Sequence, residues 1–352
     1  MSSEHTHHNS QRIPPLALTM GDPAGIGPDI TLLTWLARTK PNVPKFAVYA
    51  DPDLLQARAD ALGLRVPLYI AESPADVQGR FLDQLPVIPI ALRAKCIPGQ
   101  PDPVNAAAVL SSIETAVGHV HGGKASAIVT NPISKTILYQ VGFKHPGHTE
   151  YLASLAELHD PSTMHTPVMM LASAQLRVVP VTIHIPLAEV PRTLTPALIE
   201  KTIVVTAAAL KESFGIPAPR LAVTGLNPHA GESGSLGSEE NEIIIPAVRA
   251  LQEAGFNVSG PHPADTMFHD AARQRYDAAI AMYHDQALIP IKTLAFDTGV
   301  NVTLGLPFVR TSPDHGTAFD IAGTGNASPE SLIESLKLAA QMAARHAAPR
   351  SP

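Results

Sequence analysis

The chain has little cysteine and few aromatic residues: its 352 residues include one cysteine, Cys96, and one tryptophan, and aromatic residues make up 5%. A single cysteine excludes an internal disulfide and a zinc site built from cysteines, and it is typical of a reducing compartment. No apolar run reaches the roughly 20 residues of a membrane-spanning helix. The N-terminal segment is largely polar and has no signal-peptide core, so we expect a disordered tail at 1–13 and a cytoplasmic protein without membrane contact.

The chain also lacks a block of basic residues. Its net charge is −6, from 25 Lys and Arg against 31 Asp and Glu. This balance argues against nucleic acid as a partner, whereas small phosphorylated molecules stay open because a few local cations are enough to bind them. Hydrophobic residues make up 45% of the chain, enough for sizeable cores. The length favours about two domains of roughly 150 residues each.

Segments typical of strands alternate with segments typical of helices. The pattern predicts strands at 15–21, 45–50, 125–131, 220–227 and 276–283, and helices at 28–39, 104–120, 195–214, 241–255 and 328–347. Alternation at this period indicates an α/β architecture. Two stretches rich in Gly, Pro and polar residues, 131–148 and 298–316, are interpreted as crossings between two lobes.

Three histidines follow apolar, strand-like segments: His184, His229 and His284. Sites of open α/β sheets form outside the carboxyl ends of the strands. Three neutral imidazoles meeting there would hold a divalent transition metal and leave coordination positions open. Each histidine alone is more often a satisfied structural residue, and the separations are too long for a local motif. His262 is a competing ligand of lower rank, because it does not directly end a predicted strand.

A second group of polar residues has the chemistry of an anion site. Lys292, Asn301 and Arg310 lie in an otherwise apolar stretch, where a cation tends to have a dedicated anionic partner such as phosphate. Surface Lys and Arg are, in contrast, usually solvated. His148 beside a glycine could donate to an anionic ligand, and Thr149 either joins it or caps the following helix.

Two glycine-containing segments leave a nucleotide site open. The segment GDPAGIGPD (21–29) follows a predicted strand and opens a helix, with Asp51 as a candidate ribose acid, but its spacing is not GxGxxG. We therefore favour a tight turn that shapes a cleft. The segment SPDHGTAFDIAGTG (312–325) either binds a nucleotide through its backbone or is an irregular connection. Asp265 and Asp285 are candidate acid–base or ligand-orienting partners.

The blocks GDPAGIGPDI, VTNPISK, PGHTEYLA, GLNPHAGESGSLGSEE, YHDQALIPIK and TSPDHGTAFDIAGTG, in this order, resemble the 4-hydroxythreonine-4-phosphate dehydrogenase family of pyridoxal 5′-phosphate biosynthesis. The resemblance runs from about residue 14 to residue 346. It implies an α/β fold with two lobes and mixed sheets, similar to isocitrate and isopropylmalate dehydrogenases, with the active site in the inter-lobe cleft. The lobes would be 14–130 plus 300–346, and 131–299, the second carrying the metal ligands and dimer contacts.

The resemblance also implies the site. Metal ligands would be His184, His229 and His284 for one divalent ion such as zinc, magnesium or cobalt. Substrate would bind at His148, Thr149, Lys292, Asn301 and Arg310, in a homodimer whose active sites lie at the subunit interface. A looser correspondence places NAD or NADP at Asp314, His315, Gly316, Asp320 and Gly323. The base is left open between Asp265 and a metal-linked water, as are the metal, the choice of NAD or NADP, and the subunit that donates each residue.

The implied reaction oxidises 4-phosphohydroxy-L-threonine to 2-amino-3-oxo-4-phosphooxybutanoate, which decarboxylates to 3-amino-2-oxopropyl phosphate. Related dehydrogenases oxidise phosphorylated four-carbon sugar acids, such as erythronate or threonate 4-phosphate, or dihydrodiol carboxylates. Two other classes stay open. A phosphate acyltransferase would need no metal, so the three histidines count against it. A zinc hydrolase would need no nicotinamide cofactor.

Overall fold

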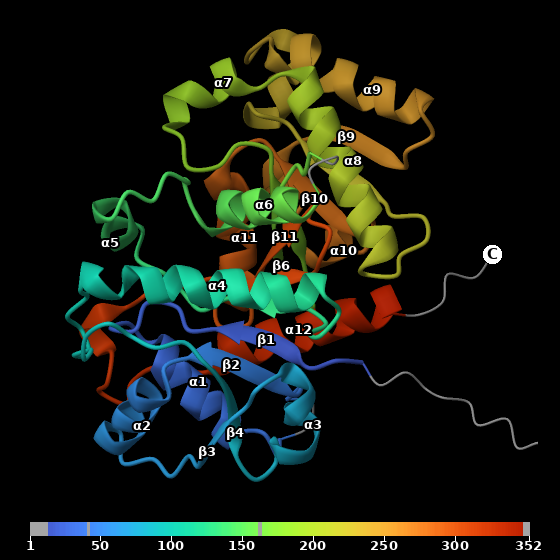
Figure 1. Cartoon of the computed structure of the whole chain (residues 1–352). Coiled ribbons are helices and arrows are strands. Elements are labelled where there is room, and N and C mark those ends of the chain that lie inside the picture. Colours follow the sequence, from blue (N-terminus) through green and yellow to red (C-terminus); the bar gives the residue numbers. More distant parts are fainter. Residues whose placement is uncertain (1–12, 41–42, 161–163, 348–352) are drawn as a thin grey trace, which may run out of the picture.

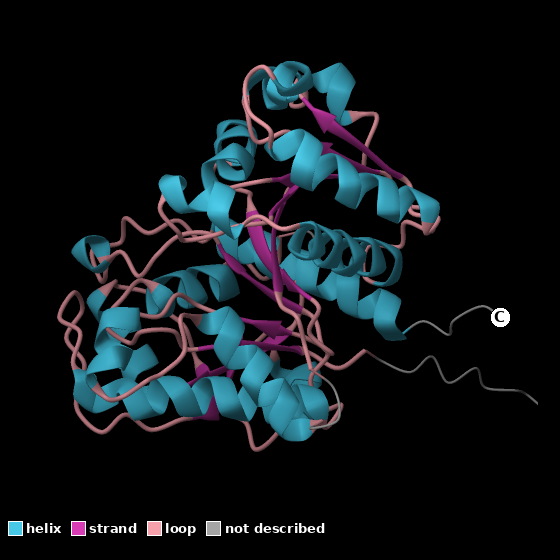
Figure 2. Ribbon diagram, turned by 90° about the horizontal axis from the view of Figure 1, so that it is seen from above, coloured by secondary structure: helices cyan, strands magenta, loops and turns pink. Residues whose placement is uncertain are grey.

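The computed structural model describes residues 13–40, 43–160 and 164–347, and most of the predicted tail at 1–13 lies outside these ranges. Within them, twelve strands form one sheet flanked by helices on both faces (Figures 1 and 2). The strands are β1 (Leu16–Thr19), β2 (Phe46–Ala50), β3 (Leu68–Ile70), β4 (Leu85–Pro89), β5 (Ile128–Val129), β6 (Val168–Ala172), β7 (Arg177–Pro180), β8 (Leu221–Thr224), β9 (Val258–His262), β10 (Ala278–Ala281), β11 (Val300–Leu304) and β12 (Arg310–Pro313).

The helices follow the strands along the chain. They are α1 (Gly27–Leu36), α2 (Pro52–Ala61), α3 (Val77–Arg80), α4 (Ala106–His121), α5 (Lys135–Gln140), α6 (His148–His159), α7 (Val190–Thr193), α8 (Pro196–Glu212), α9 (Ile245–Glu253), α10 (Asp270–Arg273), α11 (His284–Ala295) and α12 (Glu330–Ala347). Local chemistry sets several of the boundaries. Thr195 Oγ1 accepts a hydrogen bond from Leu198 N at the start of α8, as expected of a threonine cap.

The sheet reverses its strand direction at its centre. Its order is β3-β4-β2-β1-β5-β12-β11-β6-β7-β10-β8-β9. The six strands from β3 to β12 are parallel, and so are the four from β7 to β9. Between these blocks, β11 pairs antiparallel with both β12 and β6, and β6 pairs antiparallel with β7. Two parallel blocks of opposite direction therefore meet in the middle of one sheet, which is mixed as predicted.

Burial on both faces explains why the sequences of β1 and β2 are almost entirely apolar. β1 and β2 are buried at every position because helices cover both faces of a parallel sheet. In Figure 1 the blue N-terminal strands occupy the lower part of the molecule, and β9 with α8 and α9 occupies the upper part. The red helix α12 lies near the middle, where it packs on β12 and buries Leu332, Leu336, Ala339 and Ala343.

All ten predicted elements exist, but the strands are shorter than predicted and several elements were not predicted. The predicted strand at 125–131 is reduced to the two residues of β5, and β6, β11 and β12 fall in segments for which no strand was predicted. His262 is the last residue of β9, so the reason for ranking it lower was wrong. The division into lobes at 14–130 plus 300–346 and 131–299 stays a prediction.

The first glycine-rich segment packs within the chain as a tight turn. Asp51 caps α2 and accepts hydrogen bonds from Asp53 N, Leu54 N and Leu92 N, so its carboxylate is used within the chain. A side-chain carbon at Gly25 would lie 2.8 Å from Thr317 O, and one at Gly27 would lie 2.7 Å from Met20 O. These glycines allow the first loop to pack tightly, as the favoured interpretation held.

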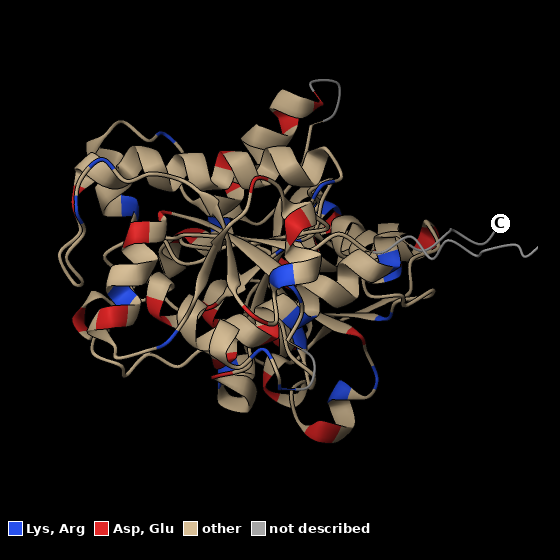
Figure 3. Cartoon of the chain, turned by 60° about the horizontal axis from the view of Figure 1, so that its bottom comes forward, with Lys and Arg blue, Asp and Glu red and all other residues tan. Residues whose placement is uncertain are grey.

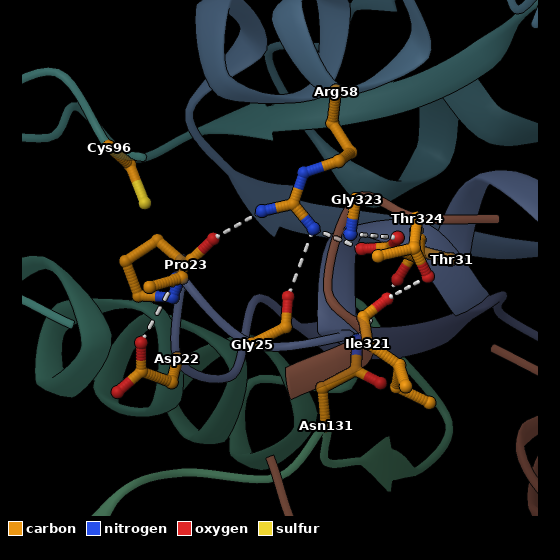
Figure 4. Close-up of polar contacts among 12 residues, drawn as sticks. Asp22, Pro23, Gly25, Thr31, Arg58, Cys96, Asn131, Ile321, Gly323 and Thr324 are labelled. Atoms are coloured by element: carbon orange, nitrogen blue, oxygen red, sulfur yellow. Dashed lines mark hydrogen bonds and ion pairs between the residues drawn. The ribbon is translucent and has the colours of Figure 1, made fainter. Parts of the chain in front are cut away.

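A buried ion pair joins this first loop to the segment before α12. Arg58, on α2, pairs with Asp29 and donates to the backbone oxygens of Pro23 and Gly25 at 3.0 Å each (Figure 4). Asp29 Oδ1 also accepts from Gly323 N at 2.7 Å. Both side chains are almost fully buried. One cation thus connects α1, α2 and the loop at 318–325.

The charged residues outside this core are mixed in sign. Figure 3 shows Lys and Arg interspersed with Asp and Glu over the described part of the chain.

No single helix in the described part of the chain is long and apolar enough to cross a membrane, although the bent pair Leu187–Thr193 and Pro196–Glu212 meets the length and composition criteria when taken together.

The substitution Arg58→Met is expected to lower the free energy of unfolding by about 3–5 kcal/mol, because it leaves the buried Asp29 carboxylate without its cation. Urea denaturation followed by circular dichroism measures the change. The matched control is Arg65→Met at an exposed position, which should change stability by less than about 0.5 kcal/mol. Equal effects of the two substitutions would contradict the role assigned to the ion pair.

Candidate functional site

A cavity of about 270 Å³ lies beside the centre of the sheet, where the strand direction reverses. Side chains from α5, α6, β11, β12, α11 and the loop after β7 line it. Its polar lining includes Lys135, His148, Thr149, Glu150, His184, His284, Asn301 and Arg310, with residues 314–316 at one side. A larger cavity of about 440 Å³ between α12 and β6 contains none of the predicted site residues. We therefore take the first cavity as the candidate site.

A buried guanidinium forms one end of this cavity. Arg310 lies opposite Thr303 in the β11–β12 pair and beside β5. Its two terminal nitrogens donate to Thr303 Oγ1 at 2.9 Å and to Thr130 Oγ1 at 2.7 Å, while its Nε has no hydrogen-bond partner in the described residues. Burial lowers the pKa of Arg310 to about 10, so it is still a cation at neutral pH. A buried cation without a paired carboxylate favours an anionic ligand.

The first turn of α6 lies against the same end. Gly147 is the helix cap, and His148 and Thr149 are the first two helical residues. The prediction that Thr149 could cap the helix is therefore wrong; it lines the cavity instead. Burial, followed by the charges of Arg310 and Lys135, holds the pKa of His148 well below its usual range. His148 is thus neutral, and its Nε2 is buried without a partner within the described ranges.

Two of the three predicted metal ligands meet at the other end of the cavity. The ring centroids of His184 and His284 are 5.7 Å apart. His284 Nδ1 hydrogen-bonds to Asp285 Oδ1 at 2.7 Å, an interaction that leaves Nε2 for a metal. Burial and then the charges of Lys135 and His284 lower the pKa of His184. A pair of imidazoles fits a divalent transition metal.

His184 is held in an unusual backbone conformation. Its φ is 53°, in the left-handed region that residues with a β-carbon rarely adopt. Such outliers cost of order 1–3 kcal/mol and persist where the surrounding structure enforces them, often at functional sites. The strain is a second indication, independent of the cavity, that this histidine is positioned for chemistry.

The third predicted ligand lies elsewhere. His229 is exposed in the turn Pro228–Gly234 and does not line the cavity. Asp265 is exposed in the turn Ala264–Thr266, which packs against the turn of His229. No group of three or more His, Cys, Asp or Glu side chains in the described ranges could hold a metal. One chain therefore brings together two of the three predicted ligands.

The exposed turn that carries His229 has an unusual backbone conformation. The five residues from His229 to Ser233 all have positive φ, between 43° and 76°. The buried Glu240 holds this turn by accepting hydrogen bonds from Leu226 N at 2.8 Å and Asn227 N at 2.7 Å. A left-handed turn costs roughly 1–2 kcal/mol for each residue with a β-carbon. The chain thus accepts backbone strain in the turn that presents His229 at the surface.

The remaining predicted residues divide between the cavity and internal contacts. Asn301 lines the cavity, whereas Lys292 forms an ion pair with Asp314 and donates to its backbone oxygen at 3.2 Å. Of the predicted cofactor residues, Asp314, His315 and Gly316 line the cavity. Asp320 is exposed outside it, and the backbone N–H of Gly323 is bound to Asp29.

Sequence reasoning missed several charged residues of the site. Lys135 and Glu150 line the cavity, and Glu240 supports the turn of His229. Lys135 ends the block VTNPISK and Glu150 lies in PGHTEYLA, so both stood in segments already singled out. Nothing in their local pattern distinguishes them from solvated surface charges, and only the fold brings them together.

The comparisons with known proteins agree on one family. The family model described as "Pyridoxal phosphate biosynthetic protein PdxA" matches residues 42–339. The 4-hydroxythreonine-4-phosphate dehydrogenase of Bradyrhizobium diazoefficiens is 56% identical over 337 residues, which are 94% of this chain and 97% of that protein. The protein of the same name from Methylorubrum populi is also 56% identical, over 95% of each chain.

Solved structures give the same result. The crystal structure of 4-hydroxythreonine-4-phosphate dehydrogenase from Klebsiella pneumoniae has a TM-score of 0.83 at 38% identity, covering 94% of this chain and 99% of that one. A terephthalate 1,2-cis-dihydrodiol dehydrogenase from Burkholderia xenovorans has a TM-score of 0.62 at 27% identity, covering 93% and 98%. The predicted α/β fold class is confirmed by these matches, and the chain belongs to the family of pyridoxal phosphate biosynthetic protein PdxA.

Proposed function

We propose that this protein is an NAD(P)-dependent oxidoreductase that oxidises the secondary alcohol of 4-phosphohydroxy-L-threonine in pyridoxal 5′-phosphate biosynthesis. The family and its named relatives support this dehydrogenase role. The observation that carries the proposal is a single cavity with the buried guanidinium of Arg310 at one end and the paired imidazoles of His184 and His284 at the other. A phosphorylated alcohol has the two groups that such a cavity would bind.

The phosphate binds at the Arg310 end. The free Nε of Arg310 and the buried Nε2 of His148 face no other partner in the described residues, so both are available to an anion. Thr149 and Asn301 add polar groups at the same wall. Because the first turn of α6 carries the positive end of the helix dipole, it favours a phosphate further. This end orients the substrate and places its hydroxyl carbon toward the histidines.

The histidine end binds a divalent metal such as zinc, magnesium or cobalt. His184 and His284 offer two imidazoles, and Asp285 orients the second one. A bound metal of this kind supplies Lewis acidity that lowers the pKa of an attached hydroxyl. The chain's own contribution is to hold the two rings in place and, through burial and the nearby charge of Lys135, to lower the pKa of His184.

The active form is a homodimer in which each site is shared between subunits. His229 and Asp265 lie together on an exposed surface away from their own chain's cavity. Their exposed positions in adjacent turns fit the third ligand and the general base of a site on a second copy, related by two-fold symmetry. His229 of the partner subunit would then complete the metal site, and Asp265 of the partner subunit would accept the hydroxyl proton.

Asp314, His315 and Gly316 would hold the cofactor NAD or NADP. These residues line the cavity, and the Nε2 of His315 is buried without a partner in the described residues. After oxidation the product is a β-keto acid, so loss of CO₂ yields 3-amino-2-oxopropyl phosphate. We place the protein in the cytoplasm.

A related dehydrogenase reaction is the second candidate. Erythronate and threonate 4-phosphate carry the same phosphate and secondary alcohol, so Arg310 and the histidine pair accommodate them equally well. The name of the Burkholderia xenovorans relative indicates that one protein with this fold oxidises a dihydrodiol. These candidates share the chemistry and differ in the substrate.

The first prediction concerns the metal and the substrate together. Purified protein given 4-phosphohydroxy-L-threonine and NAD⁺ or NADP⁺ should form reduced nicotinamide, measured by absorbance. Removal of metal by a chelator should abolish the rate, and added Zn²⁺, Co²⁺ or Mg²⁺ should restore it, because the hydroxyl proton is otherwise too weakly acidic. A full rate in metal-free buffer would exclude the metal-dependent scheme.

The second prediction concerns the phosphate end. Arg310→Lys keeps the charge but removes the two hydrogen bonds to Thr303 and Thr130 and the planar donor array. We expect kcat/KM to fall roughly 100-fold, mainly through KM. Arg249→Lys, at an exposed position on α9, is the matched control and should leave both constants unchanged. An unaltered KM in Arg310→Lys would place the phosphate elsewhere.

The third prediction tests the shared site. His229→Ala and His184→Ala should each be inactive as homodimers. The two variants are then mixed in equal amounts, unfolded and refolded together. The mixture should recover about a quarter of the wild-type activity, since half of the dimers contain one subunit of each variant and each such dimer has one intact site. The control pair is His184→Ala with His284→Ala, whose ligands belong to the same cavity. Recovery in the control pair, or none in the test pair, would contradict the arrangement.

A further inference from the structure

Two charged side chains of the cavity have no role in the function proposed so far. Lys135 is the first residue of α5, and Glu150 lies in the first turn of α6. Both line the cavity, and neither side chain makes a hydrogen bond or ion pair within the described residues. Lys135 is exposed and Glu150 is half-buried, so the Glu150 carboxylate is the more costly of the two to leave without a partner. Two charges of opposite sign beside one cavity favour a ligand that carries both a cationic and an anionic group.

The two charges lie on either side of one backbone position. A side-chain carbon placed at Gly147 would be 3.2 Å from Lys135 Nζ and 3.4 Å from Glu150 Oε2. The ammonium and the carboxylate thus approach the same point without pairing with each other. The absence of a side chain at Gly147 keeps the space between them open to a small ligand.

The pair also influences residues at both ends of the cavity. Glu150 acts electrostatically on both Arg310 and His184, and Lys135 acts on both His148 and His184. Both charges therefore act on groups at either end of the cavity. A ligand that contacts the guanidinium and the imidazoles lies within the influence of this pair.

We propose that Glu150 determines the substrate specificity of this site by binding the α-ammonium group of the substrate, while Lys135 binds the adjacent carboxylate. This inference rests on the function proposed above. When the phosphate binds at Arg310 and the hydroxyl at the histidines, two charged groups of 4-phosphohydroxy-L-threonine still need partners: its ammonium and its carboxylate. The cavity still has one carboxylate, Glu150, and one ammonium, Lys135, to bind them. A sugar-acid phosphate has a neutral hydroxyl in place of the ammonium and would leave the Glu150 carboxylate without a cation.

A purely structural role makes a different prediction. If Glu150 only balanced the charge of Arg310 and Lys135, its removal would alter the binding of every substrate by a similar factor. If it binds the ammonium, its removal affects the amine-bearing substrate selectively. The ratio between an amine and a hydroxyl substrate therefore separates the two roles, whereas the activity on one substrate alone does not.

The experiment compares 4-phosphohydroxy-L-threonine with erythronate 4-phosphate on the full-length, metal-loaded protein. The second compound is measured by its rate or, where it is not oxidised, by its inhibition constant against the first. In Glu150→Gln, we expect KM for the amine substrate to rise roughly 10- to 100-fold, the effect of losing one charged hydrogen bond. The KM or inhibition constant for erythronate 4-phosphate should stay the same or decrease.

Two further variants serve as controls. Lys135→Gln should weaken both compounds alike, because both carry the carboxylate. Glu157→Gln, on the same helix α6 but outside the cavity, should leave both constants unchanged. Thermal unfolding of each variant identifies any loss of folded protein, and Glu150→Asp should recover part of the preference if the charge itself is what matters.

The outcomes separate this inference from the proposed function. Oxidation of the amine substrate by the wild type, with an unchanged ratio in Glu150→Gln, would overturn the role of Glu150 and leave the proposed function standing. A wild type that oxidises only erythronate 4-phosphate would overturn both. The inference is supported if the preference for the amine substrate falls in Glu150→Gln and does not fall in Lys135→Gln or Glu157→Gln.

Discussion

The site depends on the reversal of strand direction between β12 and β11. Were the sheet parallel throughout, the carboxyl ends of all strands would lie along one edge. Instead, β12 belongs to the parallel block of β1 and β5, and β11 runs antiparallel beside it. Arg310 and Thr303 become direct neighbours across this pair, and Thr130 follows β5 on the other side. The reversal thus produces a buried cation held by two hydroxyls with no carboxylate partner.

The same geometry explains why the cavity has two chemically different ends. The block from β3 to β12 supplies the guanidinium, and the block from β7 to β9 supplies the loops that carry His184 and His284. The cavity lies where the two blocks meet, which is the general position of ligand sites in open α/β sheets. The ion pair of Arg58 and Asp29 contributes at a distance, since it fixes the segment that follows residues 314–316.

Much of the fold could be predicted from the sequence because its strands are buried on both faces and read as apolar runs. The strands at 46–50 and 278–281 are of this kind, and the caps of α2 and α8 are standard side chains. The central strands β11 and β12 could not be predicted in this way. Their segments contain Asn301, Arg310 and other polar residues that line the cavity, so the apolar run that marks a buried strand is interrupted by the site itself.

The candidate site could be predicted in part. His184, His284, His148, Asn301 and Arg310 were named from the sequence and line one cavity. His229 was named for the same reason as the other two histidines, yet a strand-end position does not tell whether a side chain faces its own cavity or a neighbouring molecule. Glu150 and Lys135 resemble surface charges in the sequence, and their significance comes from the missing partners that only the three-dimensional structure reveals.

The central claim is that one cavity binds the phosphate at Arg310 and the reacting alcohol at the histidines. A crystal structure of the protein with Zn²⁺ and 4-phosphohydroxy-L-threonine tests it most directly, with anomalous scattering to locate the metal. We predict the phosphate on the guanidinium of Arg310 and the metal on His184 and His284, in contact with the substrate hydroxyl. A phosphate bound away from Arg310, or a metal bound away from this pair of histidines, would contradict the account.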